Sequence, residues 1–238
     1  MNALKVAVPI SLVVLALGIP VPPAGSQEIK PAQPGSQAQA TAMPVYKPPL
    51  LGAPGGRVGG GTRGPARDMF VLSALAPNHT GITATDQPSL YWYISNVTPY
   101  PVEVTVVDPQ GADPLLEKRI PPPGAPGVQR IRLADYGVRL ASGVSYRWFV
   151  AVVLDPARRS KDILAGGTIE RIDPSEELKS KIAQAAKTEL PFLYADGGLW
   201  YDALTAISEL IEAAPQDPAL RKERAAMLVQ VGLPEIAE

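Results

Sequence analysis

The stretch Ser89-Leu-Tyr-Trp-Tyr-Ile-Ser95 decides the fold class of this chain of 238 residues. Its aromatic and aliphatic residues predict a β-strand, in which successive side chains point to opposite faces. One face then carries Leu90, Trp92 and Ile94. A large apolar stripe of this kind needs a partner surface, so we expect it to lie in a protein core.

Six further segments show the same alternation or the same enrichment in β-branched and aromatic residues. With Ser89–Ser95, the predicted strands are Phe70–Ala76, Val102–Asp108, Leu115–Ile120, Val128–Leu133, Ser145–Leu154 and Ile163–Ile172. Turn residues separate them and no helix intervenes, whereas a parallel sheet would need long crossover connections. The segments therefore predict antiparallel pairing, and a β-sandwich of about seven strands closes them most simply.

A leucine, a glycine turn and a tyrosine lead into the sixth of these strands. The spacing of Leu140, Gly143 and Tyr146 resembles the tyrosine corner of immunoglobulin and fibronectin type III sandwiches, in which the tyrosine hydroxyl bonds to nearby backbone. It predicts an immunoglobulin-like sandwich. A platform for stacking sugars, formed by Trp92, Tyr146 and Trp148, is an alternative use of the aromatic residues, but core packing is favoured because aromatics within strands are usually buried.

Short motifs occur in a fixed order along this β-rich part. They are Leu72-Ser-Ala-Leu75-x-Pro77, Gly81-x-Thr83, Pro88-x-x-Tyr91-Trp92-Tyr93, Val102-Glu-Val104, Gly143-x-x-Tyr146-x-Trp148, Asp155-x-x-x-Arg159-Ser160-x-Asp162 and Gly167-x-Ile169-x-Arg171, preceded by Arg57-Val-Gly-Gly-Gly-Thr-Arg63. Over roughly residues 50–173 this order resembles the secreted bacterial family catalogued as domain of unknown function 928. The resemblance implies an extracytoplasmic β domain and supplies no activity, catalytic residue or cofactor.

The first 26 residues predict a secretory signal peptide. The apolar stretch from Val6 to Ile19 is too short to span a membrane as a helix, and small residues Ala24 and Ser26 precede a cleavage site. An uncleaved anchor is the alternative. Because the chain has no cysteine, it carries no lipid-modified Cys. We expect a periplasmic or secreted protein with no transmembrane segment after cleavage.

Three zones of different composition follow the signal peptide. Residues 27–67 are basic and rich in proline and glycine, which predicts a largely disordered linker. Residues 68–173 make up the predicted sandwich domain. Residues 174–238 carry helical patterns and an acidic net charge, and we expect them to form a helical tail.

The tail contains an internal repeat with a period of 34 residues. Tyr194, Gly198, Leu199 and Ala203 recur as Leu228, Gly232, Leu233 and Ala237. The spacing after Ala203 resembles the second helix of a tetratricopeptide repeat. One and a half such units cannot bury a continuous core alone, so we expect the tail to pack on the sandwich, on a second copy or on a partner.

Two groups of residues are predicted to contact a partner. Because the second repeat unit stops early, Leu228, Val231 and Leu233 should lack a covering helix and offer a surface for a protein partner or for self-association. Arg158 and Arg159 lie between the last two predicted strands, where an anionic partner could bind. A salt-bridged hairpin tip is the simpler interpretation of these two arginines.

Composition excludes several functional classes. The absence of cysteine and the presence of one histidine exclude disulfides, thiol catalysis and metal sites with several histidines. A net charge of −1 gives no reason to expect nucleic-acid binding. His79 lies in a turn-like loop and is predicted to be exposed; Asp108 and Asp113 are too few for a calcium loop. Residues 57–63 lack the Gly-Lys-Ser/Thr ending of a nucleotide-binding loop. We predict no catalytic, cofactor-binding or metal-binding residue.

The sequence thus predicts a non-enzymatic protein of the cell envelope that acts as a protein-interaction or scaffold module. A sandwich that binds glycan or another polymer is the alternative, and an unrecognised hydrolase is a second one. An exposed stripe of Tyr91 and Tyr93 would favour glycan. An uncovered apolar groove over Ala203–Leu233 would favour a protein partner.

Overall fold

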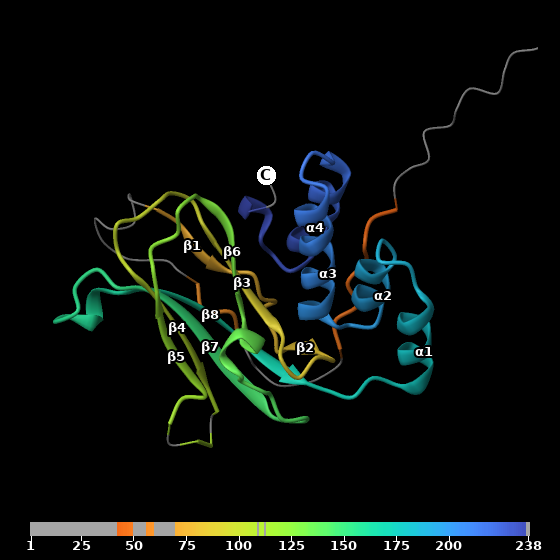
Figure 1. The fold of residues 1–238 in the computed structure, drawn as a ribbon, viewed down its shortest axis with the longest axis horizontal. Helices are drawn as coiled ribbons and strands as arrows, with labels where there is room; N and C mark the ends of the chain where they lie inside the picture. The colour runs from red at the N-terminus through yellow and green to blue at the C-terminus, as the bar shows by residue number, and fades with distance from the viewer. Residues whose placement is uncertain (1–41, 50–55, 60–69, 109, 112, 237–238) are drawn as a thin grey trace, which may run out of the picture. The chain divides into compact units, whose positions relative to one another are not determined.

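The structure is a computed structural model that describes residues 42–49, 56–59, 70–108, 110–111 and 113–236. These residues belong to one compact unit. They contain eight strands in two sheets and four α-helices, with the sheets on the left and the helices on the right of Figure 1. The predicted signal peptide and most of the predicted linker lie outside the described residues.

The smaller sheet has three antiparallel strands in the order β1-β3-β6. These strands are β1 (Leu72–Ala74), β3 (Ser89–Ile94) and β6 (Gly127–Arg132). The stretch that predicted the fold class is the central strand β3. Its alternation is reproduced on the inner face, where Leu90, Trp92 and Ile94 are each at most 1% exposed.

The larger sheet has five strands in the order β2-β8-β7-β4-β5. The bounds are β2 (Gly81–Thr83), β4 (Val102–Val107), β5 (Leu116–Ile120), β7 (Ser145–Val152) and β8 (Ile163–Arg171). All seven predicted strands are present. The eighth, β2, lies between the first two predicted strands and pairs in parallel with β8, an exception to the antiparallel prediction. Three residues are too few to show an alternating pattern.

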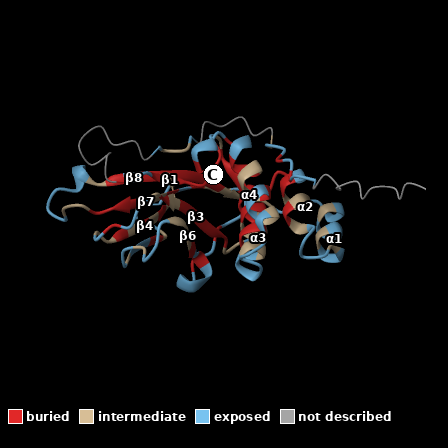
Figure 2. Cartoon of the chain, turned by 90° about the horizontal axis from the view of Figure 1, so that it is seen from above, coloured by how far each residue is buried: buried red, intermediate tan, exposed pale blue. Residues whose placement is uncertain are grey.

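The inner faces of the two sheets share one hydrophobic core. Trp92 from the smaller sheet and Tyr146 and Trp148 from the larger one are 1%, 3% and 0% exposed. Core packing of these aromatic residues is therefore confirmed, and they form no surface platform for sugars. Figure 2 shows the buried residues running through both layers of strands and continuing into the helices.

The contact that defines the predicted tyrosine corner is present. The backbone N–H of Ala141 donates to the Tyr146 hydroxyl over 3.1 Å. Gly143, in the turn between them, has a φ of 74°, a left-handed conformation that favours glycine. The local spacing in the sequence thus predicted this hydrogen bond correctly.

The helical part consists of α1 (Glu176–Gln184), α2 (Leu190–Asp196), α3 (Trp200–Ala213) and α4 (Pro218–Gln230). The side chain of Asp217 caps α4 as its sequence suggests, while Ser175 caps α1. The repeat of 34 residues is visible in the turns. Gly198 and Gly232 have φ of 73° and 75° and follow α2 and α4 respectively.

The helices share the core of the sheets instead of forming a separate tail. At the start of α3, the Trp200 Nε1–H donates to the Leu75 carbonyl over 2.9 Å. The Tyr201 hydroxyl donates to the Thr168 carbonyl over 3.0 Å and accepts from Trp148 Nε1 over 2.9 Å. Both side chains are fully buried. The predicted boundary at residue 173 is therefore not a boundary between compact units.

Parts of the predicted linker pack against this unit. We call residues 42–49 the N-terminal strap. In the strap the Tyr46 N–H donates to Gln230 Oε1 over 2.8 Å, and Gln230 Nε2 donates to the Pro44 carbonyl over 2.8 Å. The Lys47 N–H donates to the Ala195 carbonyl over 3.1 Å. These backbone contacts, together with the burial of Tyr46 against Trp200, order a segment whose composition predicted disorder.

Candidate ligand-binding cleft

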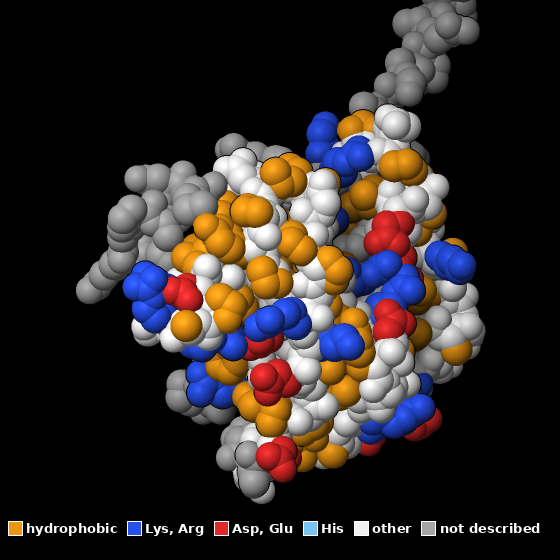
Figure 3. Space-filling view, turned by 60° about the vertical axis from the view of Figure 1, so that its left-hand side comes forward, with side chains coloured by type: hydrophobic (Ala, Val, Ile, Leu, Met, Phe, Trp, Pro, Cys, Tyr) orange, Lys and Arg blue, Asp and Glu red, His pale blue; other side chains and the backbone are white. Residues whose placement is uncertain are grey.

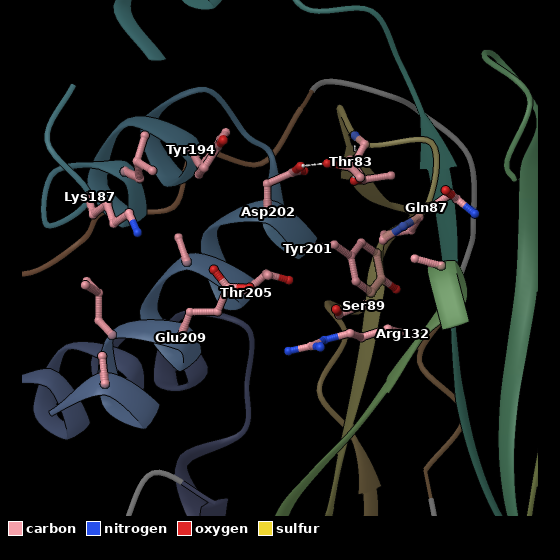
Figure 4. Close-up of a pocket in the computed structure, with 17 residues that line it drawn as sticks. Thr83, Gln87, Ser89, Arg132, Lys187, Tyr194, Tyr201, Asp202, Thr205 and Glu209 are labelled. Carbon is pink, nitrogen blue, oxygen red and sulfur yellow. Dashed lines mark hydrogen bonds between the residues drawn. The ribbon is translucent and has the colours of Figure 1, made fainter. Parts of the chain in front are cut away.

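A cleft of about 440 Å³ lies between the strands and the helices of this unit. Its strand-side wall comes from β2, the β2–β3 loop and the start of the turn that follows β6. Its helix-side wall comes from α2, α3 and the segment before α2 (Figure 4). The strand-side wall is polar and includes the hydroxyl or amide side chains of Thr83, Thr85, Gln87 and Ser89.

The Asp202 carboxylate on α3 connects the helix-side wall to the strand-side wall through hydrogen bonds. Its Oδ2 accepts from the Ala84 N–H over 3.0 Å, and its Oδ1 accepts from the Thr85 hydroxyl over 2.8 Å. Thr85 in turn donates its N–H to Thr83 Oγ1 over 3.1 Å. Burial raises the pKa of Asp202, while the hydrogen bonds from Thr85 and Ala84 oppose that rise. Both carboxylate oxygens therefore serve to hold the loop.

The remainder of the strand-side loop is fixed from a second direction. Gln87 Nε2 donates to the Val138 carbonyl over 3.2 Å, and the Leu133 N–H donates to the Pro88 carbonyl over 3.1 Å. With the Asp202 contacts, these bonds hold the loop at both ends. The polar wall of the cleft is thus pre-formed, which lowers the entropic cost of binding a ligand.

Charged side chains stand at the rim of the cleft. Arg132 comes from β6, Lys187 from the segment before α2, and Glu209 from α3. All three are exposed, and none has an ion-pair partner within the part of the chain that the structure describes. Figure 4 places Arg132 on the strand side and Lys187 on the helix side of the same opening. The rim therefore presents two cations and one carboxylate to a bound molecule.

An ion pair beside the cleft links the strand-side wall to α3. Arg130, two residues before Arg132 on β6, lies 3.1 Å from the carboxylate of Glu212 on α3. The arginine side chain is mostly buried, with 21% exposed, so solvent screens this pair less than a fully exposed one. Together with the Asp202 bonds, the pair connects α3 to both ends of the strand-side wall.

The aromatic side chains of the cleft have different roles. Tyr201 points from α3 into the layer of strands, where its hydroxyl is consumed by the core contacts described above (Figure 4). Tyr194 on α2 is half-buried and lines the cleft. Burial raises the pKa of Tyr194, and the charges of Asp202 and Glu209 raise it further. The Tyr194 phenol is therefore neutral and able to donate a hydrogen bond across the physiological pH range.

This arrangement is suited to hydrogen bonding and charge recognition. The cleft lining contains no histidine, and its buried carboxylate is occupied by two donors. Across the described residues, no group of three or more His, Asp or Glu side chains is placed to hold a metal ion. The single histidine, His79, lies outside the cleft, where its Nε2 shares a hydrogen bond of 2.9 Å with the Tyr46 hydroxyl. It is half-buried there, not exposed as predicted.

The predicted apolar partner surface is not present. Leu228, Val231 and Leu233 are 1%, 6% and 1% exposed and belong to the shared core. The backbone around them is also occupied, because the Arg57 guanidinium donates to the carbonyls of Val231 and Gly232. The covering that the truncated repeat was predicted to lack is supplied by α3, by the turn Pro234–Ile236, and by Arg57 and the N-terminal strap. These three residues cannot contact a partner in this state.

Arg158 and Arg159 lie at the tip between β7 and β8. Arg158 pairs with Asp155 at 2.5 Å, and Arg159 pairs with Asp162 and with Glu103, each at 2.6 Å. The salt-bridged hairpin tip is thus the interpretation that the geometry confirms. On the face shown in Figure 3, basic and acidic side chains are interspersed with hydrophobic ones and no field of one sign forms.

The structure also describes three other features that the sequence analysis discussed. Tyr91 is 1% exposed because α3 packs against β3, so no exposed tyrosine stripe forms. Asp108 accepts from the Gln110 N–H within its turn. Of the glycine-rich segment 57–63, only the first three residues are described, and Val58 bridges to Gly166 of β8.

Sequence reasoning missed the cleft. Its polar residues come from a loop, a strand end and a helix, and no short motif joins them. The one signal available was the polar segment Thr83–Ser89, whereas Arg132 and Lys187 lie in other segments without such enrichment. Their proximity is a tertiary result that a single sequence does not display.

Comparison with known proteins identifies a family but no activity. The family described as Domain of Unknown Function (DUF928) matches residues 58–238. The match continues through the helices, beyond the roughly 50–173 that the motifs covered, in agreement with their place in the core. No curated protein and no solved structure matches the chain. None of the helices in the described residues is long and apolar enough to cross a membrane.

Proposed function

Since the chain belongs to the DUF928 family, whose description assigns no activity, we propose from the geometry that it is a non-enzymatic binding module of the cell envelope. Its ligand is a small polar molecule held in the cleft between the β2–β3 loop and α3. Of the functions considered from the sequence, this is closest to the glycan- or polymer-binding module. The cleft replaces the aromatic platform as its binding site.

One observation carries this proposal: the cleft is pre-formed, and hydrogen-bonding side chains lie within its partly apolar lining. Its volume of about 440 Å³ falls in the lower half of the range of roughly 300–1,000 Å³ found for small-molecule sites. Ser89 and Thr205 contribute hydroxyl groups that make no hydrogen bond within the described residues, and Asp202 fixes the adjacent β2–β3 loop. A wall of fixed hydrogen-bonding groups without a paired nucleophile and base suits binding better than catalysis.

The address and the finer fold class are part of the same proposal. The apolar stretch Val6–Ile19 supports secretion. The bond from Ala141 to Tyr146 supports an immunoglobulin-like sandwich. The matching glycine turns at Gly198 and Gly232 support a tetratricopeptide-like origin of the helices.

Protein interaction is a second candidate, favoured by the N-terminal strap. Residues 42–49 pack against α2 and α4, with main-chain groups bound by the Gln230 amide and the Ala195 carbonyl. This is how a peptide is held in a groove, with affinity from backbone hydrogen bonds. The groove is filled in cis, so a partner would have to displace the strap.

A ligand screen with a blocked cleft tests the first proposal. We expect the thermal midpoint of the full chain to rise with at least one member of a panel of soluble oligosaccharides, because a ligand that binds only the folded state stabilises it. Ala206→Trp places an indole in the cleft lining and should abolish the rise.

The control is Ala214→Trp, the same substitution at an exposed position after α3 and outside the cleft lining. It should keep the response of the natural chain. If Ala206→Trp does not fold, Thr205→Leu tests the same wall with a smaller change. A midpoint that no panel member raises, or a rise that both cleft variants retain, contradicts the proposal.

A further inference from the structure

The charges at the rim of the cleft distinguish one kind of polar ligand from another. Arg132 and Lys187 are exposed, stand on opposite walls and have no ion-pair partner in the described part of the chain. By contrast, Arg130 on the same strand is paired with Glu212. Two unpaired cations facing one opening attract an anionic group, and a guanidinium can bind a carboxylate through two parallel hydrogen bonds.

The acidic groups of the cleft limit the charge of that ligand. The Asp202 carboxylate is buried and its two oxygens accept from Ala84 and Thr85, so it is not offered to a ligand. Glu209 remains exposed at the rim. Two available cations against one available carboxylate leave a net charge of about +1. That balance suits a molecule with one negative charge and opposes a polyanion.

The rest of the lining suits a body with many hydroxyl groups. The hydroxyls of Ser89 and Thr205 line the cleft, and neither makes a hydrogen bond within the described residues. Each of these two hydroxyls can both donate and accept, as can each hydroxyl of a sugar. A neutral Tyr194 phenol adds a further donor. A cleft of about 440 Å³ holds roughly one or two sugar rings.

From these three observations we propose that the ligand is a short acidic saccharide, with its carboxylate at the cationic rim formed by Arg132 and Lys187 and its hydroxyls on Ser89 and Thr205. The inference rests on the proposed function and names its ligand class. Glu209 accepts from sugar hydroxyls and excludes ligands of higher negative charge.

Isothermal titration calorimetry of the full chain tests the inference with matched probes. The acidic probe is digalacturonate, and the neutral probe is the galactose disaccharide of the same linkage. Binding of digalacturonate should be at least about ten-fold tighter, since a charge-assisted hydrogen bond contributes more than a neutral one. Added salt should weaken the acidic probe selectively, because these charges are exposed and screened.

Variants of Arg132 and Lys187 test whether these two side chains bind the carboxylate of the ligand. Arg132→Gln and Lys187→Gln should each lower the affinity for digalacturonate about ten-fold and leave the neutral disaccharide unchanged. Lys222→Gln, an exposed lysine on α4 outside the cleft, is the matched control and should change neither affinity. Circular dichroism confirms that each variant is folded.

Each other outcome has a definite meaning. Equal binding of both disaccharides overturns the inference but keeps the proposed function. If inorganic phosphate binds as tightly as digalacturonate, the cleft is a general anion site and the saccharide proposal is overturned. If a short acidic peptide binds as tightly as digalacturonate, the saccharide proposal is likewise overturned and the cleft recognises peptides. Binding of none of these probes, with no response in the oligosaccharide screen, overturns both proposals.

Discussion

Removal of one hydroxyl group at Tyr201 tests whether the helices belong to the core of the sheets. Tyr201→Phe preserves the ring and its packing and deletes the atom that links α3 to the larger sheet. That oxygen accepts from Trp148 Nε1 over 2.9 Å and donates to the Thr168 carbonyl over 3.0 Å. The Tyr201 side chain is 0% exposed, so water cannot replace either bond in the folded state.

The expected loss follows from these two bonds. Each buried hydrogen bond contributes about 0.5–1.5 kcal/mol, and a buried donor or acceptor left without a partner costs about 1–3 kcal/mol. The Trp148 N–H and the Thr168 carbonyl are both left in that position. Allowing for relaxation, we expect Tyr201→Phe to lower the free energy of unfolding by about 2–4 kcal/mol.

Urea denaturation followed by tryptophan fluorescence measures this loss. With an m value of about 2 kcal/mol/M, the midpoint should fall by about 1–2 M. Tyr194→Phe is the matched control: its hydroxyl makes no hydrogen bond within the described residues, so its loss should be below about 0.5 kcal/mol. An unchanged midpoint for Tyr201→Phe would refute the assignment of α3 to the core.

Three other predictions concern the same unit. Tyr146→Phe deletes the acceptor of the Ala141 N–H and should lower the free energy of unfolding by about 1–2 kcal/mol in the same assay; no change would make the corner contact irrelevant to stability. Burial raises the pKa of Asp202 in the folded state above its usual value of 3.8. Asp202 therefore makes its full contribution to stability below pH 3.8 and progressively less as the pH rises through its raised pKa. The unfolding free energy of the natural chain minus that of Asp202→Asn should therefore fall as the pH rises through this pKa. A difference that grows with pH would contradict a raised pKa for Asp202. Removal of residues 174–238 should abolish cooperative unfolding and near-ultraviolet circular dichroism, and a truncated chain that keeps both would restore the separate sandwich domain predicted from the sequence.

The sheets could be predicted because their signals are local. Alternation within Ser89–Ser95 and the other long strands appears at neighbouring positions, and the bond from Ala141 to Tyr146 spans five residues. The strand β2 has three residues and pairs with a strand more than eighty residues away, so it leaves no comparable pattern. A single sequence therefore revealed seven strands and missed the eighth.

The position of the helices and the cleft could not be predicted in the same way. Trp200 and Tyr201 are consecutive on α3 and yet both are buried, since the helix end enters the core instead of resting on it with one face. The period of 34 residues correctly located the equivalent turns but suggested an uncovered end. Covering by Arg57 and by the N-terminal strap depends on contacts between residues far apart in the chain. The cleft is assembled by those same long-range contacts.

Nuclear magnetic resonance mapping with digalacturonate tests the central claim, that a cleft between strands and helices is the binding site. The measurement follows the backbone amide signals of the full chain during titration. The account predicts that the largest shifts occur at Thr85, Gln87, Lys187 and Thr205, on both walls of the cleft. Shifts confined to the strap groove around Gln230, or to the hairpin tip, would contradict it.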